Sequence, residues 1–125
     1  MRLLLIDDDP EILLVARLAL EKFGGHEVDS ASSAAEAIEA VRARAPDAIV
    51  LDVLLPDARG PELLGRLRRE PGLAAVPVVF LTGKADDARV AELVSAGAAG
   101  VIGKPFDPLA LAAEVERLVG DPGGP

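Results

Sequence analysis

Acidic residues follow two apolar segments that have the character of buried β-strands. Residues 3–6 (Leu-Leu-Leu-Ile) run directly into Asp7, Asp8 and Asp9, and residues 48–51 (Ala-Ile-Val-Leu) run into Asp52. Crowded carboxylates repel one another unless a cation holds them together. Oxygen ligands alone favour Mg²⁺, which binds through one or two carboxylates and keeps several waters. The two strand ends therefore suggest a single acidic metal site.

Two further apolar segments end in a hydroxyl group and in a cation. Residues 78–81 run into Thr82, and residues 100–103 run into Lys104. An Asp beside a metal ion can attack a phosphoryl group and form an aspartyl phosphate. The Lys104 ammonium group could neutralise a phosphoryl oxygen, and the Thr82 hydroxyl could donate a hydrogen bond to another. Either residue alone is more often structural, but their joint placement favours phosphoryl chemistry.

The composition limits the class of protein. A chain of 125 residues forms one domain with a real core, and the absence of Cys excludes disulfides, thiol chemistry and cysteine-ligated zinc. No apolar run approaches the roughly 18 residues of a membrane helix, and the N-terminus does not resemble a signal peptide. We therefore expect a cytoplasmic, soluble domain. The net charge of −8 argues against direct binding of nucleic acid by this domain.

Apolar strand patterns alternate with helical periodicity along the chain. The patterns predict strands at residues 2–7, 27–31, 48–52, 77–82 and 100–102, and helices at residues 10–23, 34–44, 61–69, 85–96 and 108–119. Five such units predict an α/β, flavodoxin-like, doubly wound parallel sheet of order 2-1-3-4-5 with five helices. In that order the ligand crevice lies beyond the carboxyl ends of the first and third strands, where Asp7, Asp8 and Asp52 stand. The domain is expected to span residues 1–119, with residues 120–125 as a flexible tail or the start of a linker.

Local signals refine these elements. Asp9-Pro10 and Asp107-Pro108 predict helix starts, and Ser33 with Glu36 predicts a capping box. On the first helix, a helical wheel predicts an inward stripe and places Leu14 and Leu18 on the outer face. The inward stripe consists of Ile12, Ala16, Ala19, Leu20 and Phe23. His26, at the start of the second strand, is expected to be exposed.

Five stretches of the chain together resemble the receiver domain of two-component response regulators, and the resemblance covers nearly the whole sequence. Each stretch is weak alone, but five in the right order at the right strand ends are specific. They are Ile6-Asp7-Asp8-Asp9; Leu51-Asp52 followed by Leu55-Pro56 and Gly60; Leu81-Thr82-Gly83; Ala96-Gly97-Ala98-Ala99-Gly100; and Lys104-Pro105-Phe106.

The resemblance implies a phosphorylation-dependent signalling switch. Asp52 would accept a phosphoryl group from the phosphohistidine of a sensor histidine kinase or phosphotransfer protein. Mg²⁺ would bind directly to Asp8 and Asp52, with the Leu54 backbone carbonyl as the third protein ligand and Asp7 acting through metal-bound water. The domain would be an enzyme only in catalysing its own phosphorylation and dephosphorylation.

The resemblance also implies how the signal is passed on. Thr82 and Lys104 would contact the phosphoryl group, and the peptide between Lys104 and Pro105 would be cis. A downstream protein effector would read the face formed by the fourth helix, fifth strand and fifth helix. Kinases and phosphotransfer proteins would dock on the first helix, where Leu14 and Leu18 form an apolar pair among charged residues.

The chain departs from the family pattern at two kinds of position. Val101 stands where many receivers have a Tyr or Phe that turns inward on activation, so that side-chain switch cannot operate here. Leu54 and Lys84 occupy positions that, in the family, influence how water reaches the phosphoryl group.

Three alternative functions compete with the switch. A pseudo-receiver that binds partners without phosphate disagrees with the intact set of acidic residues. A phosphohydrolase of the haloacid-dehalogenase kind wants a second Asp two residues after its nucleophile, where this chain has Leu54. A flavin-binding electron carrier wants a phosphate loop and large aromatic residues, whereas this chain has three consecutive Asp and neither Trp nor Tyr.

Overall fold

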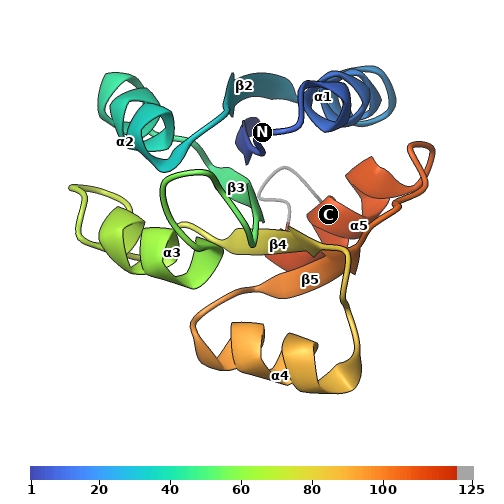
Figure 1. Cartoon of the computed structure of the whole chain (residues 1–125). Coiled ribbons are helices and arrows are strands. Elements are labelled where there is room, and N and C mark those ends of the chain that lie inside the picture. The colour runs from blue at the N-terminus through green and yellow to red at the C-terminus, as the bar shows by residue number, and fades with distance from the viewer. Residues whose placement is uncertain (121–125) are drawn as a thin grey trace.

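Five parallel strands form one sheet in the computed structural model, which describes residues 1–120 (Figure 1). The strand order β2-β1-β3-β4-β5 is the predicted one. The sequence predicted the bounds of β2 and β3 correctly, and the other three strands differ by one residue at one end. The strands are β1 (Arg2–Ile6), β2 (Glu27–Ala31), β3 (Ala48–Asp52), β4 (Val78–Thr82) and β5 (Gly100–Gly103).

Five helices connect the strands, and their first turns explain where they begin. The Asp9 carboxylate accepts a hydrogen bond from the Glu11 amide at 2.9 Å, and the Ser33 hydroxyl accepts one from the Glu36 amide at 3.1 Å. Both caps are those that the sequence predicted. The helices are α1 (Pro10–Gly24), α2 (Ala34–Ala43), α3 (Gly60–Arg68), α4 (Asp87–Ser95) and α5 (Leu111–Val119).

The predicted start of the last helix at Pro108 is wrong. Residues 108–110 form a turn, and α5 begins at Leu111. The Asp107 carboxylate accepts a hydrogen bond from the Leu109 amide at 2.9 Å, and the Asp107 carbonyl accepts bonds from Ala110 and Leu111 at 3.0 Å. The Asp-Pro signal therefore marks a capped turn that leads into the helix.

The helices cover both faces of the sheet, as a parallel sheet requires (Figure 1). Helices α1 and α5 pack on one face, and α2, α3 and α4 pack on the other. Successive residues of β3 and β4 alternate between the two cores and are buried on both sides. Phe80 is fully buried in the α2–α3–α4 core, while its neighbours Val79 and Leu81 belong to the α1–α5 core. The sheet is thus a rigid platform for residues at its carboxyl edge.

Two predictions about the end of α1 are wrong, and they have one cause. Phe23 is 58 % exposed, whereas His26 is only 6 % exposed. The inward position of the last turn belongs to Gly24, where a Cβ atom would lie 2.5 Å from the His26 ring and 2.9 Å from the Ala112 side chain. The missing side chain leaves the space that His26 fills, so Phe23 lies on the surface.

No helix among residues 1–120 is both long enough and apolar enough to cross a membrane. Residues 121–125, which make up most of the predicted tail, lie outside the described part of the chain.

Candidate acidic site at the carboxyl ends of the strands

Strand register brings the predicted site residues to one edge of the sheet. Ile6 pairs with Leu51, so that Asp7 and Asp52 follow their strands side by side. Asp52 pairs with Leu81, and Thr82 pairs with Gly103, the residue before Lys104. The residues predicted from four separate segments therefore meet beyond the ends of β1, β3, β4 and β5.

Three carboxylates form the centre of this site. Oxygen atoms of Asp7, Asp8 and Asp52 all lie within 4.8 Å of one another. Asp7 is fully buried and Asp52 is 8 % exposed, whereas Asp8 is exposed to solvent. An all-oxygen cluster that is buried on one side and open on the other fits a hard divalent cation that keeps part of its water shell.

Lys104 is shared between two of these carboxylates. Its ammonium nitrogen lies 2.8 Å from Asp7 Oδ2 and 3.3 Å from Asp52 Oδ1. The other oxygen of Asp7 accepts a hydrogen bond from the Asp9 amide at 2.9 Å. The peptide between Lys104 and Pro105 is cis, as predicted.

The crowding of charges changes the acid–base properties of the site. Burial, and after it the Asp7 carboxylate, raises the pKa of Asp52 above its ordinary value, although Lys104 acts in the opposite direction. Burial alone would lower the pKa of Lys104, but the hydrogen bond and charge of Asp7, followed by Asp52, raise it above its ordinary value. Lys104 therefore balances only part of the negative charge at the site. The remaining negative charge would attract an added cation.

Thr82 and Leu54 border the carboxylates in different ways. Thr82 is buried, and its hydroxyl oxygen accepts a hydrogen bond from the Lys84 amide at 3.1 Å. The Leu54 side chain is 61 % exposed, while its amide points to Asp52 Oδ1 at 3.4 Å. Leu54 thus borders the cluster with its backbone and presents its side chain to solvent.

The amino-acid sequence gave no indication of the role of one residue near the site. Asp57, in the loop after β3, accepts hydrogen bonds from the Ala34 and Ala35 amides at 2.8 and 3.1 Å. The sequence around it, Leu55-Pro56-Asp57, indicates only a turn. A partner 22 residues away in the chain leaves no local signal.

Comparison with known proteins agrees with this geometry. The model of the response regulator receiver domain matches residues 3–116. Protein Rrf1 of Nitratidesulfovibrio vulgaris is 36 % identical over 118 residues, which cover 94 % of this chain and 82 % of Rrf1. The transcriptional regulatory protein KdpE of Mycobacterium tuberculosis is 38 % identical over 103 residues, or 82 % of this chain and 44 % of KdpE. The chain thus spans most of Rrf1 but under half of KdpE.

Solved structures resemble the whole fold. The chemotaxis response regulator CheY4 of Vibrio cholerae superposes with a TM-score of 0.87 at 27 % identity, covering 94 % of this chain and 97 % of CheY4. The receiver domain of NtrX from Brucella abortus superposes with a TM-score of 0.84 at 28 % identity, covering 95 % and 98 %. With its fold, its acidic edge and its relatives in agreement, this chain belongs to the response regulator receiver domain family of two-component systems, whose general function is phosphorylation-dependent switching.

Proposed function

We propose that Asp52 is the residue of this receiver domain that accepts the phosphoryl group. One observation carries the proposal: Asp52 Oδ1 is held by Lys104 and by the Leu54 amide, whereas no hydrogen bond within residues 1–120 reaches Oδ2. A carboxylate held in place at one oxygen presents the other as an oriented nucleophile. Asp52 also stands on the central strand β3, between the acidic pair on β1 and the Thr82 end of β4.

We assign the cation of this reaction to Mg²⁺, held by Asp8, Asp52 and the backbone carbonyl of Leu54. Asp8 is exposed, and among the described residues no hydrogen bond reaches its carboxylate, so it can take a metal directly. Both oxygens of Asp7 already accept hydrogen bonds, from Asp9 and Lys104, which supports a role through metal-bound water. When bound, Mg²⁺ would neutralise the carboxylates and the oxygens of the phosphoryl group.

The transfer itself would exchange one bond for another. Asp52 Oδ2 forms the new O–P bond while the N–P bond of a phosphohistidine breaks, and the bonding electrons stay on the imidazole nitrogen of the donor. Lys104 contacts one phosphoryl oxygen. The Thr82 hydroxyl, now bound to the Lys84 amide, donates a hydrogen bond to another. Slow hydrolysis follows from Leu54, whose exposed apolar side chain cannot orient a water molecule.

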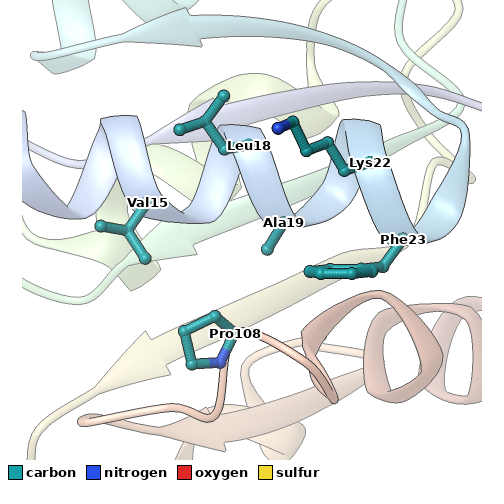
Figure 2. A pocket seen from close by; sticks show the side chains of 6 residues that line it. All are labelled: Val15, Leu18, Ala19, Lys22, Phe23 and Pro108. Carbon is teal, nitrogen blue, oxygen red and sulfur yellow. The ribbon is translucent and has the colours of Figure 1, made fainter.

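The phosphoryl donor is a sensor histidine kinase or a phosphotransfer protein, and we place its docking site on α1. Leu14 and Leu18 are 58 % and 44 % exposed on this helix. Beside them, Val15, Ala19 and Phe23 face Pro108 across an apolar groove (Figure 2). Pro108 follows Lys104 by four residues in the chain. We propose that the helix carrying the phosphohistidine docks on this surface and that the donor acts in the cytoplasm.

The phosphorylated state would be read by a downstream protein effector on the face of α4, β5 and α5. Val101 on β5 is half-buried against the α2–α3–α4 core. Because Val101 lacks an aromatic ring, we expect phosphorylation to be transmitted by shifts in the backbone and packing of this face. We expect this domain not to bind nucleic acid directly.

The site is tested by labelling with acetyl phosphate and with beryllofluoride, each with and without Mg²⁺. We expect labelling of the parent only with Mg²⁺ and none of Asp52→Asn. Undiminished labelling of Asp52→Asn would refute the assignment. No labelling of a folded parent would favour the pseudo-receiver, and rapid turnover of other phosphate esters would favour a phosphohydrolase.

The docking surface is tested separately with Leu14→Glu and Leu18→Glu. Phosphotransfer from the cognate donor should slow at least tenfold, while labelling by acetyl phosphate stays unchanged. Val94→Glu is the matched control, because Val94 is 47 % exposed on α4. Equal transfer rates in the parent and the α1 variants would refute the docking surface.

A further inference from the structure

The loop that follows Asp52 is folded back on itself and held at its base. The Leu55 amide donates a hydrogen bond to the Ala58 carbonyl at 3.1 Å, and Leu54 forms an isolated antiparallel bridge with Arg59. At the base, the Gly60 amide donates to the Val53 carbonyl at 2.6 Å. This loop carries the backbone of Leu54 beside the carboxylates, so its position matters for the site.

Gly60 is required where the loop closes. A Cβ atom at this position would lie 2.5 Å from the Phe80 ring and 2.9 Å from the Cα atom of Val53. Both contacts are closer than real Cβ atoms make, and Phe80 is fully buried and cannot move aside. The base of the loop is therefore fixed against the core.

Asp57 ties the tip of the loop to α2 by hydrogen bonds, while Leu55 and Ala58 pack against the α2–α3–α4 core. Its two carboxylate oxygens accept the amides of Ala34 and Ala35, the first two residues of α2. The third amide, that of Glu36, is already capped locally by Ser33. A helix N-terminus attracts a negative charge because its amides are unpaired and its dipole is positive there. These two backbone hydrogen bonds hold the pKa of Asp57 below its ordinary value.

We propose that Asp57 is a positioning residue for the cation site: by tying the loop to α2, it holds the Leu54 backbone against the carboxylates. The inference rests on the proposed function, because it takes Asp8, Asp52 and Leu54 as the ligands of the cation. Ser33 already caps the Glu36 amide from the residue next to α2, so helix capping alone would not require a residue from this loop. Because linkage is reciprocal, a cation or phosphoryl group that orders Leu54 also strengthens the tie to α2. The stability of the first turn of α2 therefore depends on whether a cation or phosphoryl group is bound at the site.

Two variants separate positioning from simple helix capping. Asp57→Ala removes two amide partners from α2 and releases the loop tip from this helix, whereas Ser33→Ala removes one partner from the same helix and leaves the loop tip tied. Mg²⁺ affinity is measured for each by calorimetry, together with hydrogen exchange at the Leu54 and Leu55 amides. Asp57→Asn, which keeps one acceptor oxygen, provides a graded rescue.

We expect Asp57→Ala to weaken Mg²⁺ binding roughly tenfold, as is usual when a group behind a metal ligand is lost. Exchange at Leu54 and Leu55 should accelerate in the same variant. Ser33→Ala should change the affinity less than about twofold, and Asp57→Asn should fall between. Equal losses in Asp57→Ala and Ser33→Ala, or no loss in either, would overturn this inference alone. A parent that binds no Mg²⁺ would overturn the proposed cation site as well.

Discussion

Charged residues are arranged differently at the two ends of the sheet. At the amino end, Arg2 pairs with Glu27 at 2.5 Å and with Asp29 at 3.6 Å. His26 there lies between the Met1 amine, 3.1 Å from Nδ1, and Glu116, 3.7 Å from Nε2. At the carboxyl end, three carboxylates form a cluster, and Lys104 pairs with two of them, Asp7 and Asp52.

Charged residues at the amino end stabilise the fold, whereas those at the carboxyl end form the candidate site. At the amino end, Glu27, Asp29 and Glu116 are exposed or half-exposed, so solvent screens the charge that Arg2 and the Met1 amine do not balance. The carboxyl end keeps more negative charge than its one lysine balances, which costs stability and leaves affinity for a cation.

Removing the shared cation should have the largest effect. Lys104→Met leaves the buried Asp7 carboxylate without its partner and should lower the free energy of unfolding by roughly 3 kcal/mol in metal-free buffer. Arg2→Met at the amino end should cost below about 1 kcal/mol, because its partners Glu27 and Asp29 are largely exposed. Urea unfolding followed by circular dichroism measures both. Equal costs for the two variants would contradict the contrast.

Truncating the buried imidazole should have the next largest effect. His26→Ala opens a cavity beside Gly24 and removes the acceptor of the Met1 amine, so the free energy of unfolding should fall by about 2 kcal/mol. The loss should be the same with and without Mg²⁺, since His26 lies at the far end of the sheet. A loss that Mg²⁺ repairs would show that the two ends are coupled.

Neutralising the proposed acceptor should have a small effect of opposite sign. Asp52→Asn removes a charge that burial and Asp7 disfavour, and metal-free protein should become more stable by less than about 1 kcal/mol, because attraction to Lys104 is lost as well. Mg²⁺ should then stabilise the variant less than the parent. Thermal unfolding with and without Mg²⁺ checks both statements, and a destabilised metal-free variant would contradict the first.

The smallest effect should be a dependence on pH. Because the folded-state pKa of Asp52 is raised above its unfolded value of 3.8, the folded protein binds this proton more tightly than the unfolded chain does. Between the unfolded and folded pKa values of Asp52, its contribution to the free energy of unfolding falls as pH rises in metal-free buffer. With Mg²⁺ the sign should reverse, because the metal competes with the proton. Subtracting the Asp52→Asn profile from the parent profile should isolate both slopes, and identical pH profiles for variant and parent would contradict this reasoning.

The sequence predicted the fold because its signals are local and consistent. Apolar runs and helical periodicity gave all ten elements, and Asp9 and Ser33 predicted the caps that the structure contains. Two signals were ambiguous because competing local structures use the same residues. Asp107-Pro108 begins a capped turn as readily as a helix, and Phe23 belongs to an apolar stripe whose last inward position is Gly24.

The candidate site residues can be identified from the amino-acid sequence alone. Each of Asp7, Asp8, Asp52, Thr82 and Lys104 follows an apolar strand, and parallel strands carry such residues to one edge of the sheet. Tertiary structure alone decided how these groups share charge, that His26 is buried, and that Asp57 caps a helix from another loop. Such contacts join residues 22 or more positions apart. No periodicity encodes them, because they depend on the distances that the packed sheet and helices impose.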